Sequence, residues 1–391
     1  IDGDGTVTYA DTSENWYNYC DKRWANAVIL EDNASYKVGD IIQESDIESY
    51  FVWIPKYKYK LWNTGTASES VHEIDIIFDE TDTTDVEGIS CKTPMVSGET
   101  GNCNNGEYMT HPAFISMNTN GFWVGKFETG YKGATSVATA QVNANDSSKV
   151  IIKPNVYSWR NITVYNAFLA SYNYDRKLDS HMMKNTEWGA VAYLSHSKYG
   201  KNAEININNN SSYKTGYSAL ASTNQQTCPG TYGDGDIYNS TYNTINGYKA
   251  STSGNISGVY DMSGGAWEYV SAYITGKPGS SGFSTTTLAD YDSKYFDTYN
   301  TSSAISTYQY RILGDATGEM GPFKQYLDGD NSPRWHSSWY GDYSPFVDSS
   351  YPWFTRGGLY ISGVLAGIFF FNSQTGGTAN EGGFRLVLSV A

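Results

Sequence analysis

The sequence carries little positive charge. Lys and Arg number 26 against 41 Asp and Glu, which gives a formal net charge of −15 over 391 residues. A surface this acidic repels a phosphate backbone, so nucleic acid is excluded as a partner. Charged residues of both signs make up only 17 % of the chain, so other side chains must supply most of its polarity.

Long hydrophobic runs and closely paired cysteines are also lacking. No apolar run reaches the roughly 18 residues of a membrane span, so no membrane span is expected in this chain. The four cysteines form no CxxC pair, which argues against a zinc site or a thioredoxin-like motif. Cys91 and Cys103 flank a Gly- and Asn-rich stretch, and they either close a local disulfide loop or stay unpaired. Because the chain begins at Ile1 rather than Met, we expect a processed form whose signal or anchor has been removed.

Polarity comes instead from Asn, Ser, Thr, Gly and 34 tyrosines. Tyr, Ser, Gly and Asn are the residues favoured in adaptable recognition loops. The composition therefore predicts an extracellular binding protein. A loop-rich extracellular β protein without a binding role fits the same composition.

The first 45 residues are acidic and weakly periodic, and they are expected to form a small N-terminal extension. Asp2 and Asp4, followed by Gly5, are spaced like part of a Ca²⁺ loop, in which alternating carboxylates precede a sharp turn. A plain Asp-Gly turn explains the same residues. A structural Ca²⁺ ion is the only cofactor that this sequence suggests.

The remaining chain mixes strand and helix patterns. Alternating or strongly apolar segments predict strands at 51–62, 71–78 and 121–128. Helical spacing predicts helices at about 163–176, capped by Thr163, and at about 184–195. Two polar stretches, 200–257 and 277–307, are expected to be long surface loops. Together these patterns indicate an α+β domain with two helices and short antiparallel strands.

Six short motifs occur in order between residues 51 and 387. They read Phe-Val-Trp-Ile-Pro at 51–55, Phe-Trp-Val-Gly-Lys-Phe-Glu at 122–128, Asn-Thr-Glu-Trp-Gly-Ala at 185–190, Gly-Val-Tyr-Asp-Met-Ser-Gly-Gly-Ala-Trp-Glu-Tyr at 258–269, Arg-Gly-Gly at 356–358 and Gly-Phe-Arg-Leu-Val at 383–387. In this order the chain resembles the formylglycine-generating-enzyme (sulfatase-modifying factor) family, a branch of the C-type lectin fold. The resemblance implies a C-type-lectin-like domain over 46–391, with insertions near 200–257 and 277–307.

Several residues of these motifs are predicted to hold the scaffold. Trp188 and Trp267 are large apolar side chains that are expected to pin helix and sheet together. Arg356 and Arg385 lie among glycines and aromatics, where an Arg usually bridges carboxylates or carbonyls. The candidate carboxylate partners are Asp261 and Glu268.

The catalytic groups of the family are missing. The family's oxidases bind copper through a pair of C-terminal cysteines, but no Cys follows Cys228 here. The five histidines show no HxxxH or HxH spacing, and His181 and His196 are expected to be solvated helix ends. We therefore expect no catalytic residue and no enzymatic activity. A metal-dependent oxidase with an altered site is the alternative.

The C-terminal segment from about residue 335 to 371 places large aromatics among Gly, Pro, Ser and Asp. Strand alternation, with Phe369 and Phe371 facing the core, predicts that Phe370 points outward. The family frame likewise places Tyr360 in the core. The predicted outward surface comprises Leu359, Ile361, Val364, Leu365 and Phe370. Either this surface binds a ligand, or it packs against the N-terminal segment or a second copy of the chain.

The same segment also resembles the variable proteins of diversity-generating retroelements, which use this lectin-like fold. The matching frame is Arg-Gly-Gly at 356–358, Ala-Gly at 366–367, Phe-Asn at 371–372 and Gly-Phe-Arg at 383–385. The resemblance implies a fixed scaffold with diversified exposed positions, on a bacterial cell surface or a phage virion. It adds further contact candidates: Trp339, Tyr340, Tyr343, Phe346, Tyr351 and Phe354.

Three functional hypotheses follow. The first is a non-catalytic protein that binds a protein ligand or a cell-surface receptor through this surface, since the surface is broad and apolar. The second is the altered oxidase. The third is a structural subunit of a pilus or phage tail that uses the same face for assembly.

Overall fold

The computed structural model describes residues 5–11, 13, 16–60, 71–78, 108–220, 240–299, 323–325 and 336–389. Over these residues the chain is a mixed α+β protein, as the sequence predicts, with four α-helices and many short strands. Asp2, Asp4, Cys91 and Cys103 lie outside the described residues, so the predicted Ca²⁺ loop and local disulfide stay predictions.

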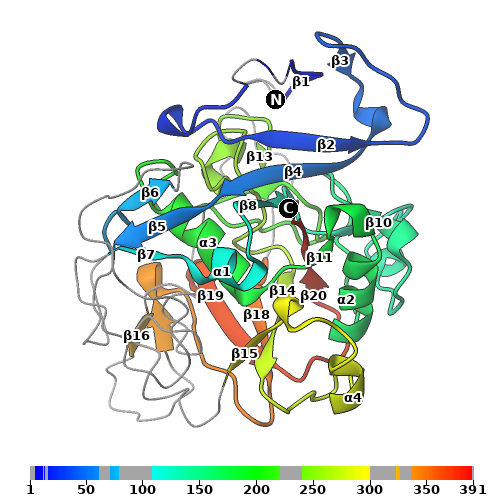
Figure 1. Cartoon of the computed structure of the whole chain (residues 1–391), viewed down its shortest axis with the longest axis vertical. Coiled ribbons are helices and arrows are strands. Elements are labelled where there is room, and N and C mark those ends of the chain that lie inside the picture. The colour runs from blue at the N-terminus through cyan, green and yellow to red at the C-terminus, as the bar shows by residue number, and fades with distance from the viewer. Residues whose placement is uncertain are drawn as a thin grey trace.

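One five-stranded antiparallel sheet has the order β11-β21-β8-β4-β2. Its strands are β2 (Asn26–Leu30), β4 (Ile47–Pro55), β8 (Gly121–Gly125), β11 (His181–Met182) and β21 (Leu386–Leu388). The expected strands at 51–62 and 121–128 thus contribute β4 and β8, and the strand pattern continues after Pro55 as β5 (Tyr57–Lys60). Figure 1 shows β2 and β4 crossing the top of the molecule, with β1 (Val7–Thr8) and β3 (Ile41–Ile42) beyond β2.

A second sheet has the order β15-β14-β18-β19, with β20 also paired to β14. It consists of β14 (Trp267–Ile274), β15 (Asp297–Tyr299), β18 (Trp353–Gly357), β19 (Gly367–Gln374) and β20 (Gly382–Phe384). Strand β14 pairs in parallel with β15 and with β20, whereas the β14–β18 and β18–β19 pairs are antiparallel. The C-terminal segment that the sequence singles out therefore forms the centre and one edge of this sheet.

The remaining strands form small sheets. Three of them pair in the order β6-β5-β7, with β6 at Ile76–Phe78 and β7 at Tyr108–Thr110. The others are two-stranded pairs: β1 with β3, β9 (Gly130–Tyr131) with β10 (Val150–Ile151), β12 (Tyr217–Ser218) with β13 (Ser240–Thr241), and β16 (Phe323–Gln325) with β17 (His336–Ser338).

Both predicted helices are present, as α2 (Val164–Tyr172) and α3 (Asn185–Ser195). Thr163 caps α2 as expected, its side chain accepting a hydrogen bond from the Asn166 N–H. The helix ends four residues earlier than predicted, and a separate 3₁₀ turn at Arg176–Leu178 follows, capped by Asp175. Two further short helices, α1 (Pro112–Met117) and α4 (Thr285–Leu288), were not predicted, because each is too short to show helical periodicity.

Helix α3 is buried over its whole length, from Asn185 to Ser195. A helix that is buried all round belongs to a protein core rather than to a surface. It contacts α1 and both β14 and β19 of the second sheet. A carboxylate from another element caps the N-terminus of α3, since the Thr186 N–H donates to the Asp297 side chain of β15 at 2.7 Å.

Both stretches expected as surface loops supply core residues in their described parts. Ile205, Ile207 and Ala219 are buried in the first, and Phe283 and Tyr295 in the second. The polar composition misled the prediction, because a few well-placed apolar side chains are enough to bring a segment into the core.

The division of the chain at residue 45 stays a prediction. The residues before 46 include β2, which pairs with β4 along its length. Trp24, only 1 % exposed, donates from its ring Nε1 to the Tyr199 carbonyl at 2.8 Å. Among the described residues, no helix is long and apolar enough to cross a membrane.

Candidate functional site

The predicted binding surface lies on the connection between β18 and β19, residues 358–366. The two strands pair from Trp353 opposite Gln374 to Arg356 opposite Phe371, and the register then shifts so that Gly357 lies opposite Gly367. The shift leaves residues 368–370 of β19 without a matching residue on β18. The connection therefore leaves the sheet at an irregular point rather than at a tight hairpin.

Buried polar groups hold the base of this connection. Arg356 is fully buried, and its Nη1 donates to the Asn185 side chain at 2.9 Å. Its Nη2 and the ring Nε1 of Trp188 both donate to the Ile368 carbonyl, at 3.2 and 2.8 Å. The guanidinium also lies 5.4 Å from the centre of the Trp188 ring. Arg356 and Trp188 thus join the start of β19 to the first turn of α3.

The connection itself is bonded internally and to its neighbours. Ser362 accepts a hydrogen bond from the Leu359 N–H through its hydroxyl and donates its own N–H to the Leu359 carbonyl. The Tyr360 N–H donates to the Gly265 carbonyl at 2.9 Å, and the Tyr343 N–H donates to the Leu365 carbonyl at 3.0 Å. These bonds fix the backbone from both sides.

Three apolar side chains project from this fixed backbone into solvent. Ile361 is 46 % exposed, Val364 is 36 % exposed and Leu365 is 51 % exposed. We call Ile361, Val364 and Leu365 the apolar loop surface. Leu359, which was predicted to belong to it, is half-buried and packs against core residues.

The prediction that Phe370 is exposed is wrong, because its side chain is only 6 % exposed. Alternation along β19 does turn Phe370 away from the cluster that contains Phe369 and Phe371. The opposite face is covered, however, because a Cβ at Gly358 would lie 3.4 Å from the Phe370 ring and Tyr343 lies 6.1 Å from it. The connection between β18 and β19 thus folds back over Phe370, which was expected to lie exposed beside it.

Two further contact candidates are buried. Trp339 is 4 % exposed, with its ring 5.5 Å from Phe369, and Phe354 is fully buried, with its ring 4.8 Å from Tyr299. Both are contact candidates only through the resemblance to retroelement variable proteins, and their burial contradicts that expectation. Segments distant in sequence cover them instead.

Tyr360 was expected in the core, but it is half-buried and packs edge-on against Tyr213 with ring centres 4.9 Å apart. β18 ends at Gly357, and both Gly357 and Gly358 have positive φ, so strand alternation does not extend to position 360.

The remaining candidates are partly accessible. Tyr351 is 42 % exposed, whereas Tyr340, Tyr343 and Phe346 are half-buried. The Tyr340 hydroxyl lies 2.5 Å from Nε2 of His196. Of the eleven predicted contact residues, the structure thus brings Ile361, Val364 and Leu365 together on one loop and leaves Tyr351 on the separate segment before β18.

Asp342 is a residue of this region that the sequence did not indicate. It is 1 % exposed, and its Oδ2 accepts a hydrogen bond from the Phe369 N–H at 3.0 Å. Its Oδ1 has no hydrogen-bond partner in the part of the chain that the structure describes. Burial raises the pKa of the Asp342 carboxyl well above its ordinary value. No spacing signal could have revealed it, because its partner on β19 is distant in sequence.

A second buried polar network holds the scaffold. Arg385 forms a two-pronged ion pair with Glu268, with N–O distances of 2.6 and 2.9 Å, as the sequence suggested. The other candidate partner, Asp261, accepts instead from the Asn208 side chain and the Gly216 N–H, both at 2.8 Å. Trp267 is 8 % exposed beside this network.

Burial perturbs the carboxyls of this network. It raises the pKa of Glu268 to about 7, although the Arg385 guanidinium opposes the shift, and it raises the pKa of Glu128 well above its usual range. Glu128 accepts hydrogen bonds from the Ala266 N–H at 2.9 Å and from the Ser158 hydroxyl. These bonds tie the carboxylates to the protein itself, which is the arrangement of a structural network.

The histidines behave differently from the prediction. His181 and His196 are buried, at 0 and 3 % exposed, rather than solvated. His181 pairs with Glu187 at 2.8 Å, and burial lowers the pKa of His196 to about 4. Within the described ranges, no group of three or more His, Cys, Asp or Glu residues is arranged to hold a metal ion.

Comparison with protein-family models gives no match for this chain, and comparison with curated proteins gives none either.

Proposed function

We propose that this chain is a non-catalytic ligand- or receptor-binding protein that presents the apolar loop surface on a C-type-lectin-like scaffold. The observation that carries the proposal is the exposure of Ile361, Val364 and Leu365 within five residues of a hydrogen-bonded connection. Exposed apolar side chains that gather at one place are typical of interaction sites, and rigid scaffolds commonly present binding residues on loops.

The fixed backbone supports this role energetically. A mobile loop loses conformational entropy when it binds, which lowers affinity, whereas a loop already ordered loses less. Bonds from Tyr360 to Gly265 and from Tyr343 to Leu365 order this connection before any ligand arrives. Its side chains can therefore change without changing the backbone that carries them.

We propose a protein ligand outside the cell, on a bacterial surface or encountered by a phage virion. Aliphatic side chains such as Ile361, Val364 and Leu365 suit an apolar patch of a protein better than a sugar or a nucleic acid. The acidic charge of the chain, −15, repels nucleic acid further.

The binding role is tested with matched surface variants. The whole chain is used as bait for cross-linking to envelope proteins of intact bacterial cells, alongside a chain carrying Ile361→Asp and Leu365→Asp. Ile245→Asp is the control, because Ile245 is 82 % exposed and lies elsewhere in the sequence. We expect the captured band to be lost in the double variant and kept in the control.

Two outcomes would contradict this role. Capture that is equal in all three chains would place binding elsewhere. A wild-type chain that self-associates in light scattering, with a monomeric double variant, would favour a structural assembly subunit instead.

Diversification of this surface is a separate part of the proposal. The DNA beside the gene should hold a reverse-transcriptase gene and a near-repeat of the codons for about 335–387. Differences between repeat and gene should fall at adenines in codons such as those of Ile361 and Val364. If neither feature is present, diversification is rejected while ligand binding is still tested by the cross-linking experiment.

A further inference from the structure

Strand β2 is an edge strand of the first five-stranded sheet, at the end opposite β11. In the described part of the chain, β2 pairs with β4 alone. An edge strand presents unpaired backbone N–H and C=O groups that can accept another strand. Figure 1 places this edge at the top of the molecule, away from β18 and β19.

The direction of the free backbone groups follows from the neighbours of Tyr50. The Tyr50 N–H donates to the Ile152 carbonyl, and the Tyr50 carbonyl accepts from the Lys126 N–H, both at 2.9 Å. Both backbone polar groups of Tyr50 therefore point away from β2. Val28 lies opposite Tyr50 and therefore occupies a non-hydrogen-bonded position of the β2–β4 ladder. The N–H and C=O of Val28 thus point toward the open edge.

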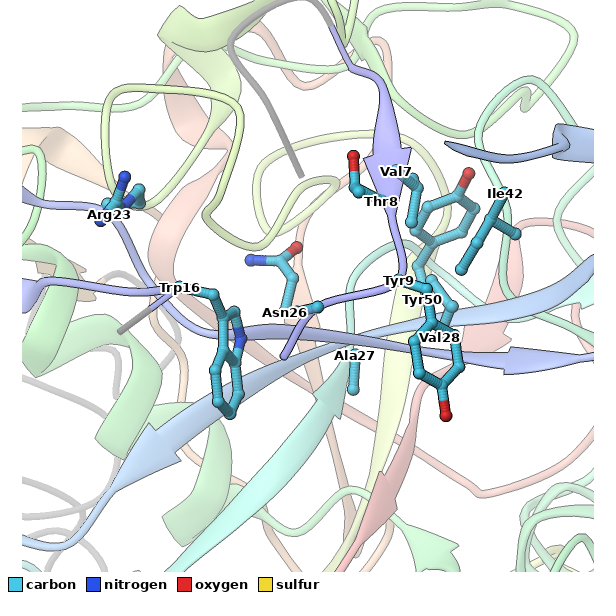
Figure 2. A pocket seen from close by; sticks show the side chains of 11 residues that line it. Val7, Thr8, Tyr9, Trp16, Arg23, Asn26, Ala27, Val28, Ile42 and Tyr50 are labelled. Atoms are coloured by element: carbon cyan, nitrogen blue, oxygen red, sulfur yellow. The ribbon is translucent and has the colours of Figure 1, made fainter. Parts of the chain in front are cut away.

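A pocket of about 590 Å³ lies along this edge. Three consecutive residues of β2, Asn26, Ala27 and Val28, line it. Successive side chains of a strand point to opposite faces, so contact with all three indicates a pocket that lies along the strand edge. Residues 7–10 of the N-terminal segment also line the pocket, and Figure 2 shows Val7, Thr8 and Tyr9 among its lining side chains.

The walls of this pocket, which we call the edge slot, are largely apolar with a single cation. Ile42 and Tyr50 are buried behind it, and Trp16 closes one side. Arg23 is the one charged side chain among the described residues that line the slot. In a chain with a net charge of −15, an exposed Arg beside an apolar slot favours a partner that brings a carboxylate.

We propose that the edge slot accepts an extended peptide segment that adds to β2 as a further strand, places apolar side chains in the slot and directs an acidic side chain to Arg23. Strand addition takes affinity from main-chain hydrogen bonds and specificity from pockets for alternate side chains. The slot supplies both, with Val28 giving the main-chain groups. Its volume lies within the range of about 300–1,000 Å³ typical of ligand pockets.

A peptide fits these features better than a small carboxylate does. A small molecule needs the apolar wall and Arg23, but it makes no use of an open strand edge. The edge slot is separate from the apolar loop surface, so each of the two proposals is tested independently of the other.

The test uses a fluorescein-labelled hexapeptide with blocked ends, valine at the first, third and fifth positions, threonine at the second and fourth, and aspartate at the sixth. We expect saturable binding to the whole chain in fluorescence anisotropy. Val28→Pro removes the edge-facing N–H without breaking a bond to β4, and it should weaken binding about threefold to tenfold. Hydrogen exchange at the Val28 amide should slow when the peptide binds.

Charge is tested separately. Arg23→Glu should weaken binding of the aspartate peptide about threefold to tenfold and leave a peptide ending in asparagine unaffected. Lys37→Glu makes the same charge change at an exposed residue that does not line the slot, and it should change neither. Ala27→Trp is a second blocking variant, because Ala27 is exposed and its enlargement fills the slot.

The proposal is overturned if the wild-type chain shows no saturable binding of the hexapeptide. It is also overturned if Val28→Pro and Ala27→Trp, shown to be folded by circular dichroism, bind as the wild type does. Sodium hexanoate that binds more tightly than the peptide would assign the slot to small carboxylates and reject strand addition.

Discussion

Asp342 shows how a single buried carboxyl can shape the base of the proposed binding loop. It lies against β19, where a Cβ on Gly367 would come within 2.0 Å of its Oδ2. Only one of its two oxygens has a hydrogen-bond partner among the described residues. Burying an ionised carboxylate that is incompletely bonded is costly, so the protonated form is favoured.

This carboxyl should make stability depend on pH. Its pKa is raised in the folded chain, whereas an unfolded Asp titrates near about 3.9. Above that pH the folded chain keeps a proton that the unfolded chain loses, so the free energy of unfolding falls as pH rises toward the raised pKa. Asp342→Asn should remove a slope of about 1.4 kcal/mol per pH unit, measured by urea unfolding across a pH series.

Asp32→Asn, at an exposed carboxylate, controls for the loss of one charge. Since Glu128, Asp261 and Glu268 also have raised pKa values, the difference in slope between variant and wild type is the informative quantity. An Asp342→Asn chain with the wild-type slope would show that Asp342 is ionised in the fold.

At the scale of elements, the connection between β18 and β19 depends on glycine. Gly358 has φ +79°, and a Cβ there would lie 2.9 Å from Ala366, at the other end of the connection. The Phe370 ring lies beside this approach, since a Cβ at Gly358 would also come within 3.4 Å of it. Alternation gives the correct face for Phe370, but the connection covers that face, so the expected exposure is wrong.

Gly358→Ala should therefore lower the free energy of unfolding by about 2–4 kcal/mol, from positive φ and overpacking together. Gly133→Ala is the matched control, because Gly133 has φ +87° but nothing within 4 Å of its Cβ position. The control should lose about 1 kcal/mol, the cost of positive φ alone. Equal losses in chemical denaturation would mean that the contact with Ala366 contributes nothing.

Element prediction succeeded where periodicity was long and failed where packing decided. Helical spacing located α2 and α3, and apolar segments located β4 and β8. The segments at 200–257 and 277–307 carry few apolar residues, yet they complete the core through residues such as Ile207 and Phe283. Composition averages over a segment, whereas a core needs only a few well-placed side chains.

At the scale of the whole molecule, the N-terminal segment is joined to the rest by more than chain continuity. β2 pairs with β4 from Asn26 to Leu30, and the Trp24 N–H donates to the Ser257 hydroxyl at 2.8 Å. The bond from Trp24 joins residues more than two hundred positions apart. The pairing of β2 with β4 also creates the edge at which the peptide slot lies.

A chain that starts at residue 46 should consequently be less stable than one that starts at residue 16. It loses the strand beside β4 and the buried Trp24 ring, whose removal alone should cost at least about 3 kcal/mol. Urea unfolding followed by circular dichroism measures the difference between the two chains. Equal midpoints would mean that the first 45 residues form an independent extension, as the sequence suggested.

Local patterns along the chain were enough to predict the α+β class, the two longer helices and the exposed aliphatic residues at 361, 364 and 365, because periodicity and loop position depend on neighbouring residues. Contacts between distant segments bury Phe370, Trp339 and Phe354 and place His181 and His196 inside the protein. Such contacts also bury Asp342 and form the edge slot. Burial and pKa depend on what distant segments bring to a residue, and one sequence read along its length does not contain that information.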